Sequence, residues 1–172
     1  YTLVDAAEVE KDVAHLINGH APKEIAEACS ELNIPLVHIS TDYVFSGEGN
    51  TDWNPTDKVS PVNEYGKSKL MGEEAIISSR AIYAILRTSW IISSNGNNFV
   101  KTMLRLSEDQ KNLNVVSDQI GGPTPARDIA LACISIAKQL MKDPKKSGIY
   151  HFSGLPNVSW YDLATTIFKL SG

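Results

Sequence analysis

The chain has 172 residues, a net charge of −4 and 42% hydrophobic residues, enough for one sizeable hydrophobic core. This acidic balance, without a basic stripe carrying interleaved aromatic residues, argues against nucleic-acid binding. No apolar run has membrane-spanning length and the start does not resemble a signal peptide, so we expect a cytoplasmic protein that does not act at a membrane. Cys29 and Cys133 lie on apolar faces of predicted helices, which favours reduced core thiols. The four histidines lack metal-ligand spacing, so no metal site is predicted.

Helices and strands are expected to alternate in the first part of the chain. Residues 22–32 have the pattern of a helix, with Pro22 near its start. An apolar run over 36–39 predicts a buried parallel strand that ends at Ser40. Residues 46–63 are rich in Gly, Pro, Asn and Asp, and are numerous enough to be a functional loop. The predicted apolar face of the helix consists of Ile25, Ala28, Cys29 and Leu32.

The same alternation continues to the end of the chain. Asp128 lies in the first turn of a predicted helix, where the helix dipole favours a negative charge. Ser159 and Asp162 resemble a capping box, with Asp in place of the usual Glu. The predicted helices cover residues 65–78, 99–106, 127–140 and 159–170, and the predicted strands cover 81–86, 113–116 and 149–152.

Tyr65 and Lys69 are the most informative pair in the sequence. On a helix, residues four positions apart lie one turn apart on the same face. A lysine ammonium beside a phenol favours the phenolate and lowers the phenol pKa, so that Tyr65 could act as a general acid or base near neutral pH. Lys69 could also donate hydrogen bonds to the ribose of a cofactor. Taken alone, the spacing is also typical of a surface tyrosine and a solvated lysine.

Polar residues follow the predicted strand that precedes this helix. Ser40, Thr41 and Asp42 come directly after the apolar run. In doubly wound sheets, ligands bind outside the carboxyl ends of the strands. The hydroxyl of Thr41 and the phenol of Tyr65 are therefore expected to converge on one carbonyl oxygen.

These features belong to a longer series of motifs in one collinear order. The series resembles the extended short-chain dehydrogenase/reductase family and, within it, the dTDP-4-dehydrorhamnose reductases. The segments that carry the resemblance are Tyr1-Thr2 with Val4-Asp5, Asn18 with Ala21-Pro22, Ser40-Thr41-Asp42-Tyr43-Val44-Phe45, Tyr65-Gly66-Lys67-Ser68-Lys69-Leu70 with Gly72-Glu73, Arg87-Thr88-Ser89-Trp90, Asn98-Phe99, Asp118-Gln119 with Gly122-Pro123-Thr124, and Ser159-Trp160-Tyr161.

The resemblance implies an α/β fold: a Rossmann-like doubly wound parallel sheet, incomplete here, with a smaller interleaved substrate-binding domain. Residues 1–90 would form the last part of the dinucleotide-binding domain and carry the catalytic residues. Residues 91–172 would contribute to the substrate-binding domain and return to the sheet. The Gly-rich turn that opens this family, and that holds the cofactor pyrophosphate, does not occur in the sequence. We therefore expect an internal fragment, inactive in isolation, whose first residues end a middle strand.

The resemblance also implies a role for each site residue. The activity would be reduction of the C4 keto group of dTDP-4-dehydro-L-rhamnose by NADPH or NADH. Tyr65 would be the proton donor, Thr41 would bind the same oxygen, and Lys69 would lower the Tyr65 pKa and hold the nicotinamide ribose. The implied cofactor-binding residues are Lys69, Tyr65, Ser40, Asp42 and Tyr43. The implied substrate-binding residues are Trp90, Val4, Thr41, Gln119 and Thr124.

Several alternatives stay open at this point. Asp42 and Tyr43 could contact the cofactor, cover the substrate or only cap a turn. Asn18 could order water or backbone behind Lys69, and Arg87 could hold either a phosphate or a buried carboxylate. Two alternative functions share the same motifs. The chain could be a non-catalytic regulatory subunit that resembles that of methionine adenosyltransferase, or another nucleotide-4-keto-sugar reductase. The sequence does not decide between NADPH and NADH, and a homodimer is one option for the oligomeric state.

Overall fold

The computed structural model describes residues 1–110 and 112–171. The chain divides into two compact units and passes between them more than once. Unit 1 consists of Tyr1–Thr88 and Ala132–His151, and unit 2 consists of Ser89–Leu131 and Phe152–Gly172. Unit 1 is therefore built from two stretches of chain that a part of unit 2 separates.

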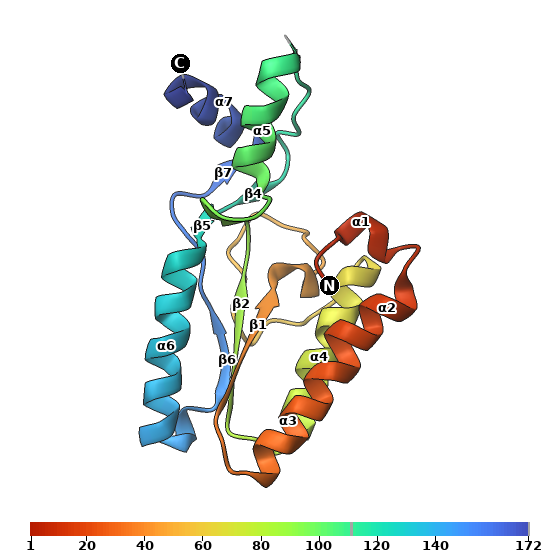
Figure 1. Ribbon diagram of the computed structural model, residues 1–172, viewed down its shortest axis with the longest axis vertical. Helices are drawn as coiled ribbons and strands as arrows, with labels where there is room; N and C mark the ends of the chain where they lie inside the picture. The colour runs from red at the N-terminus through yellow and green to blue at the C-terminus, as the bar shows by residue number, and fades with distance from the viewer. Residues whose placement is uncertain (111, 172) are drawn as a thin grey trace. The chain divides into compact units, whose positions relative to one another are not determined.

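A parallel sheet forms the centre of unit 1 (Figure 1). Its strands are β1 (Leu36–Thr41), β2 (Tyr83–Thr88) and β6 (Gly148–His151), in the order β1-β2-β6. Both pairs of neighbours are parallel, so the carboxyl ends of the strands meet at one edge, where Thr41 lies beside Thr88. Three of the four predicted strands are thereby confirmed, with β2 beginning and ending two residues later than predicted.

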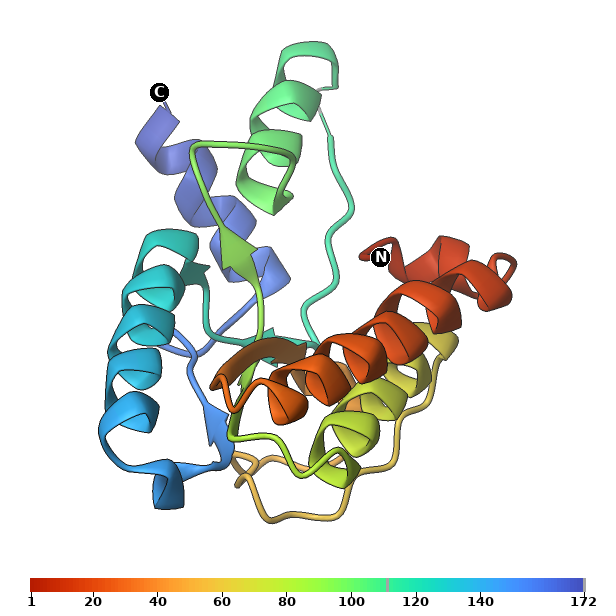
Figure 2. The same cartoon turned by 60° about the horizontal axis from the view of Figure 1, so that its bottom comes forward.

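Helices lie on both sides of this sheet. Helices α3 (Ala21–Glu31) and α4 (Glu64–Ser78) run side by side on one face, and α6 (Ala126–Lys142) lies on the opposite face over its residues in unit 1 (Figures 1 and 2). Alternating helices and parallel strands with helices on both faces are the layers of a Rossmann-like fold. The core beneath α3 and α4 consists of Ala26, Ile76 and Ile85, with Leu36, Tyr83 and Ile149 packed against it.

The helix predicted over 22–32 exists, but it buries a different face. Ile25 is 53% exposed and Leu32 is 68% exposed, whereas Pro22 and Ala26 are buried. Small residues occupy the inner face because α3 and α4 approach closely: a Cβ added at Gly72 would lie 3.5 Å from Pro22. Helical spacing alone could not show which of the two faces met α4.

Residues 1–3 form neither helix nor strand, and a short helix begins at the fourth residue. Val4 begins the short helix α1 (Val4–Ala7), so its expected place at a strand end was wrong. Helix α2 (Lys11–His15) follows and continues through a π-helical turn (Leu16–His20) directly into α3. The buried Asn18 lies in this turn, where its amide donates hydrogen bonds to the Tyr1 carbonyl (3.0 Å) and to Ser68 Oγ (3.0 Å). Asn18 thus holds the backbone of Tyr1 and the side chain of Ser68, the residue that precedes Lys69.

Unit 2 is organised around two packed helices. Helix α5 (Phe99–Asp109) and helix α7 (Trp160–Ser171) enclose a small apolar core of Met103, Ala164 and Ile167. The predicted capping box at the start of α7 is confirmed: Ser159 N donates to Asp162 Oδ2 (3.3 Å) and Asp162 N donates to Ser159 Oγ (3.0 Å). The short strands of this unit are β3 (Ile91–Ile92) paired with β5 (Thr124–Pro125), and β4 (Ile120–Gly121) paired with β7 (Val158–Ser159).

Two predictions on local structure need correction. No strand forms over 113–116: Leu113 and Val115 pack against the α5–α7 core, and Val116 O accepts one hydrogen bond from Tyr161 N (3.0 Å). Cys29 and Cys133 are free thiols, as expected, but they are only half-buried. Among the described residues, no helix combines the length and the apolar character needed to cross a bilayer.

Candidate active site

Helix α4 holds Tyr65 and Lys69 in its first turns. Asn63 caps the helix, since its Oδ1 accepts a hydrogen bond from Gly66 N (2.7 Å), and so fixes where the helical spacing begins. Gly66 is required next to Tyr65 because a Cβ at that position would collide with the backbone carbonyl of Tyr43. The start of α4 is therefore pressed against the segment that follows β1.

Thr41 and Tyr65 converge, as the sequence predicted. Thr41 is the last residue of β1 and is buried. Its hydroxyl donates to Asp42 Oδ1 (3.1 Å) and accepts from Tyr43 N (3.2 Å), so a short 3-10 helix (Asp42–Val44) is capped by Thr41. The Thr41 side chain also interacts with the phenol of Tyr65, an interaction that acts to lower the Tyr65 pKa. A hydroxyl and a phenol thus lie together at the carboxyl edge of the sheet.

Tyr65 is held as a neutral phenol. Burial raises its pKa above the ordinary value of 10.0, the hydrogen bond with Thr41 opposes this, and the negative charge of Asp42 adds to it. The ring of Tyr43 packs edge-to-face on that of Tyr65, with centroids 5.5 Å apart. The expected lowering of the Tyr65 pKa by Lys69 is not found. At neutral pH Tyr65 therefore carries its proton, while burial makes the phenol a weaker acid than a free tyrosine.

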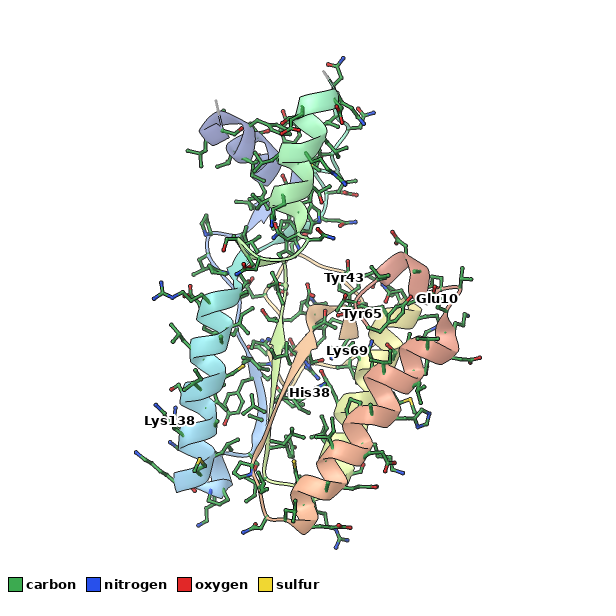
Figure 3. All side chains as sticks on the ribbon, in the orientation of Figure 1. Glu10, His38, Tyr43, Tyr65, Lys69 and Lys138 are labelled. Atoms are coloured by element: carbon green, nitrogen blue, oxygen red, sulfur yellow. The ribbon has the colours of Figure 1, made fainter. Side chains whose placement is uncertain are left out.

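Lys69 is directed toward β1. Its ammonium donates to Ile39 O (2.8 Å) and lies 3.3 Å from Nε2 of His38 (Figure 3). Burial lowers the pKa of Lys69, and the carboxylate of Glu73 opposes this shift. The direction of the Tyr65 pKa shift is set mainly by burial, while the Lys69 ammonium contacts Ile39 O and His38.

Ser40 and Arg87 contribute to the interior, not to a ligand surface. Ser40 is 3% exposed and donates to Glu73 Oε1 (2.5 Å), so the predicted contact of its side chain with a cofactor is not supported. Arg87 is 4% exposed and binds the same carboxylate, with Nη2 2.6 Å from Glu73 Oε2. Of the two alternatives for Arg87, the structure shows the buried carboxylate. Thr88 is buried too, and its Oγ1 has no hydrogen-bond partner among the described residues.

The residues predicted to bind substrate are divided between the units. Val4 is half-buried in unit 1, and Trp90, Gln119 and Thr124 belong to unit 2. Gln119 is exposed. Thr124 is fully buried: its hydroxyl donates to Gly122 O (2.8 Å) and accepts from Gly154 N (3.0 Å), so direct substrate binding by this side chain is not supported.

Trp90 adopts an unusual backbone conformation within unit 2. Its φ is +47°, in the left-handed region that bulky residues rarely occupy. Its ring stacks on Trp160, with centroids 3.4 Å apart and planes inclined by 7°. A Cβ at Gly121 would lie 2.5 Å from the Trp90 ring, so only glycine leaves space there. The ring is half-buried and held in one orientation by its neighbours.

Sequence reasoning missed Glu73, His38 and Trp160. The signal for Glu73 was present, because it lies four residues after Lys69 and hence on the same face of α4. The signal for His38 was its spacing from Ser40: the two residues are two positions apart on β1 and therefore lie on the same face of the strand. Nothing in the sequence pattern singled out the contact between Trp160 and Trp90. The described residues contain no group of three or more His, Cys, Asp or Glu side chains that could hold a metal ion.

Comparison with known proteins adds a family to this geometry. The family model of the RmlD substrate binding domain matches residues 1–172. The chain belongs to the RmlD substrate-binding-domain family. A member of similar sequence, a dTDP-4-dehydrorhamnose reductase from Aggregatibacter actinomycetemcomitans, is 47% identical over 169 residues, which cover 98% of this chain and 58% of that protein.

Solved structures of the RmlD family agree with the fold described above. A dTDP-4-dehydrorhamnose reductase ortholog from Clostridium acetobutylicum superposes with a TM-score of 0.92 at 39% identity, over 100% of this chain and 59% of its own. The enzyme from Bacillus anthracis, solved in complex with NADP, gives a TM-score of 0.90 at 39% identity, over 99% of this chain and 59% of its own. The Rossmann-like α/β fold is thereby confirmed. This chain spans less than two thirds of the length of these relatives.

Proposed function

We propose that the natural full-length polypeptide containing this sequence reduces the C4 keto group of dTDP-4-dehydro-L-rhamnose to give dTDP-L-rhamnose, with NADPH or NADH. The convergence of the Thr41 hydroxyl and the Tyr65 phenol at the carboxyl edge of the sheet carries this proposal. Membership of the RmlD family, whose relatives bear this activity in their names, supports the choice of substrate.

Tyr65 is assigned the proton transfer. Reduction of a ketone adds a hydride to carbon and a proton to oxygen, so an alcohol forms only if an acid lies beside that oxygen. Burial raises the Tyr65 pKa and keeps the phenol protonated at neutral pH. Thr41 orients the carbonyl by a hydrogen bond. The phenolate that remains on Tyr65 after the transfer regains its proton from water.

Lys69 is assigned to the cofactor. When bound, a reduced nicotinamide supplies the hydride. The residues present fit such a group: an ammonium has three donors, and Lys69 uses one on Ile39 O and faces His38 with another. A further donor can bind ribose hydroxyls. The hydroxyl of Thr88, which has no hydrogen-bond partner within the described part of the chain, lies beside Thr41 at the same edge and offers one more polar contact for a ligand. Asp42 and Tyr43 stay proposed as contacts near the same place.

Unit 2 is proposed to bind the nucleotide sugar. Trp90 would supply the wall of the sugar site, and the exposed Gln119 a polar contact. The support is the stacking of the half-buried Trp90 ring on Trp160, since an indole that is already ordered loses little rotational freedom when it binds a ligand. We place the reaction in the cytoplasm, with a homodimer as the form to be tested by sedimentation.

An assay of the full-length protein tests the proposal. NADPH oxidation is followed with dTDP-4-dehydro-L-rhamnose and with other dTDP-4-keto sugars, and the product is identified by NMR. We expect turnover with the first substrate to exceed that with the others. Turnover only with another 4-keto sugar would change the assigned substrate. Binding of cofactor with no turnover on any sugar would instead indicate a non-catalytic subunit.

A further inference from the structure

A buried ion pair lies behind the candidate active site. Arg87 binds both carboxylate oxygens of Glu73, with Nε 3.0 Å from Oε1 and Nη2 2.6 Å from Oε2. The side chains are 4% and 1% exposed. A buried pair of this kind loses so much hydration that it adds little net stability compared with apolar residues of the same size. Its directional bonds, however, restrict where the attached elements can lie.

The pair connects the elements that carry the candidate catalytic residues. Glu73 lies on α4, on the same face as Lys69 one turn before it. Arg87 lies on β2 directly beside Ser40 on β1, and Ser40 donates to Glu73 Oε1 (2.5 Å). Thr41 is the next residue after Ser40. One carboxylate therefore fixes β1, β2 and α4 relative to one another close to the site.

The same arginine also holds the loop between Thr41 and Tyr65. Its Nη1 donates to Pro55 O (3.4 Å), and its guanidinium lies 5.0 Å from the centroid of the Phe45 ring. Phe45 stacks on Trp53, with centroids 4.6 Å apart and planes inclined by 4°. His151 on β6 contacts the same loop, with Nδ1 3.0 Å from Trp53 O.

We propose that Glu73, Arg87 and Ser40 form a positioning device, here named the Glu73 hub, that sets the distance between the Thr41 hydroxyl and the Tyr65 phenol. None of its members touches the reacting atoms. The hub fixes the strand end that carries Thr41, the helix that carries Tyr65, and the loop that joins them. This inference rests on the proposed function for its kinetic consequences, but the ordering of the loop is independent of any substrate.

The key experiment separates positioning from stability in the full-length protein. Arg87→Met leaves the buried carboxylate of Glu73 without its charged partner and with only the Ser40 hydrogen bond, and should destabilise the fold. The double variant Glu73→Leu/Arg87→Met removes both charges and should recover most of that stability. If the hub positions the site, kcat of the double variant stays about 10²-fold below the parent, because displacement of about 1 Å in an active site has this cost. The KM for NADPH should change less than kcat.

Two further variants support this comparison. Ser40→Ala removes one bond of the hub and should lower kcat by a smaller factor, on the order of 10-fold, because the ion pair itself stays intact. Lys23→Met/Glu27→Leu is the matched control: it removes an exposed ion pair of 3.6 Å on α3 and should leave kcat unchanged.

Amide hydrogen exchange gives a readout that needs no substrate. Exchange in residues 42–60 should be faster in the double variant than in the parent, including at Ser60, whose N–H donates to Val44 O (2.9 Å). A stable double variant with parental kcat and parental exchange would overturn the inference. If the double variant does not fold, unchanged kcat and exchange in Ser40→Ala would overturn it equally. If the parent protein shows no reductase activity, that result counts against the proposed function alone. The exchange data would still decide whether the hub orders the loop.

Discussion

Lys69 and His38 face each other across the space between α4 and β1, with 3.3 Å between Nζ and Nε2 (Figure 3). An imidazole can accept a hydrogen bond from an ammonium only in its neutral form. Burial, and next the charge of Lys69, lower the pKa of His38 to about 4 from its ordinary 6.5. This histidine is therefore uncharged in the folded protein over the physiological pH range.

The first prediction follows from this shift. When the pH falls from 6.5 toward about 4, the unfolded chain takes up a proton at His38 before the folded chain does. The free energy of unfolding should therefore decrease across this window, while above pH 6.5 His38 has no such effect. His38→Gln should flatten the decrease, as measured by urea denaturation at a series of pH values. His151, whose pKa burial also lowers, stays in both proteins, so the difference between the two curves is the test. Parallel curves would mean that His38 is not held neutral.

The second prediction concerns the proton donor. In the full-length protein, Tyr65→Phe should lower kcat by roughly 10²–10⁴-fold with little change in stability, because it removes only the acid. Steady-state kinetics and thermal unfolding measure both quantities. Tyr161→Phe, at a tyrosine that is 54% exposed, is the control and should keep parental kcat. A Tyr65→Phe variant within a few-fold of the parent would show that another group supplies the proton.

The third prediction concerns the aromatic stack of unit 2. Gly121→Ala places a methyl group 2.5 Å from the Trp90 ring, so the ring must move off Trp160. We expect the free energy of unfolding to fall by about 1–3 kcal/mol. By calorimetry, the variant should lose more affinity for the nucleotide sugar than for NADPH. Gly148→Ala is the matched control, since its added Cβ would meet only Tyr150 at an ordinary 3.9 Å. Equal losses for both ligands would mean that Trp90 supports the fold and does not contact the sugar.

The fourth prediction concerns Glu64, the first residue of α4. A hydrogen bond from Lys67 at 2.8 Å, together with His15 and Lys11, lowers the pKa of Glu64 to about 2 from 4.5. The stabilisation from Glu64 should be complete above pH 4.5 and should disappear as the pH falls toward about 2. Denaturation curves of Glu64→Gln should therefore differ from the parent at neutral pH and coincide with it near pH 2. Glu74→Gln, at an exposed position of the same helix, controls for charge alone. A difference that persists at pH 2 would assign the effect to packing.

The parts of the fold that sequence predicted well are those fixed by local rules. The strand before Ser40 and the helix that carries Tyr65 follow from an apolar run and from helical spacing. The convergence of Thr41 and Tyr65 followed from the general position of ligand sites in parallel sheets.

The errors arose where a partner, not a pattern, decides the outcome. Leu113 and Val115 alternate like a strand, but their side chains pack on helices and no neighbouring strand pairs with their backbone among the described residues. Thr124 is polar, yet its hydroxyl is occupied by two backbone groups, Gly122 O nearby and Gly154 N, which is 30 residues away. The direction of Lys69 depended likewise on His38, which is 31 residues away.

The interruption of unit 1 by unit 2 affects how the sheet assembles. Strand β6 pairs with β2 only after the chain between Thr88 and Gly148 has closed into a loop. Because the entropy of loop closure grows only with the logarithm of length, doubling that stretch would cost about 0.6 kcal/mol. Unit 2 could thus gain or lose residues over generations at little expense to the sheet. A protease acting there would have a larger effect: one cut between Ser89 and Leu131 would leave β6 on a separate polypeptide, and the completeness of the sheet would then depend on protein concentration.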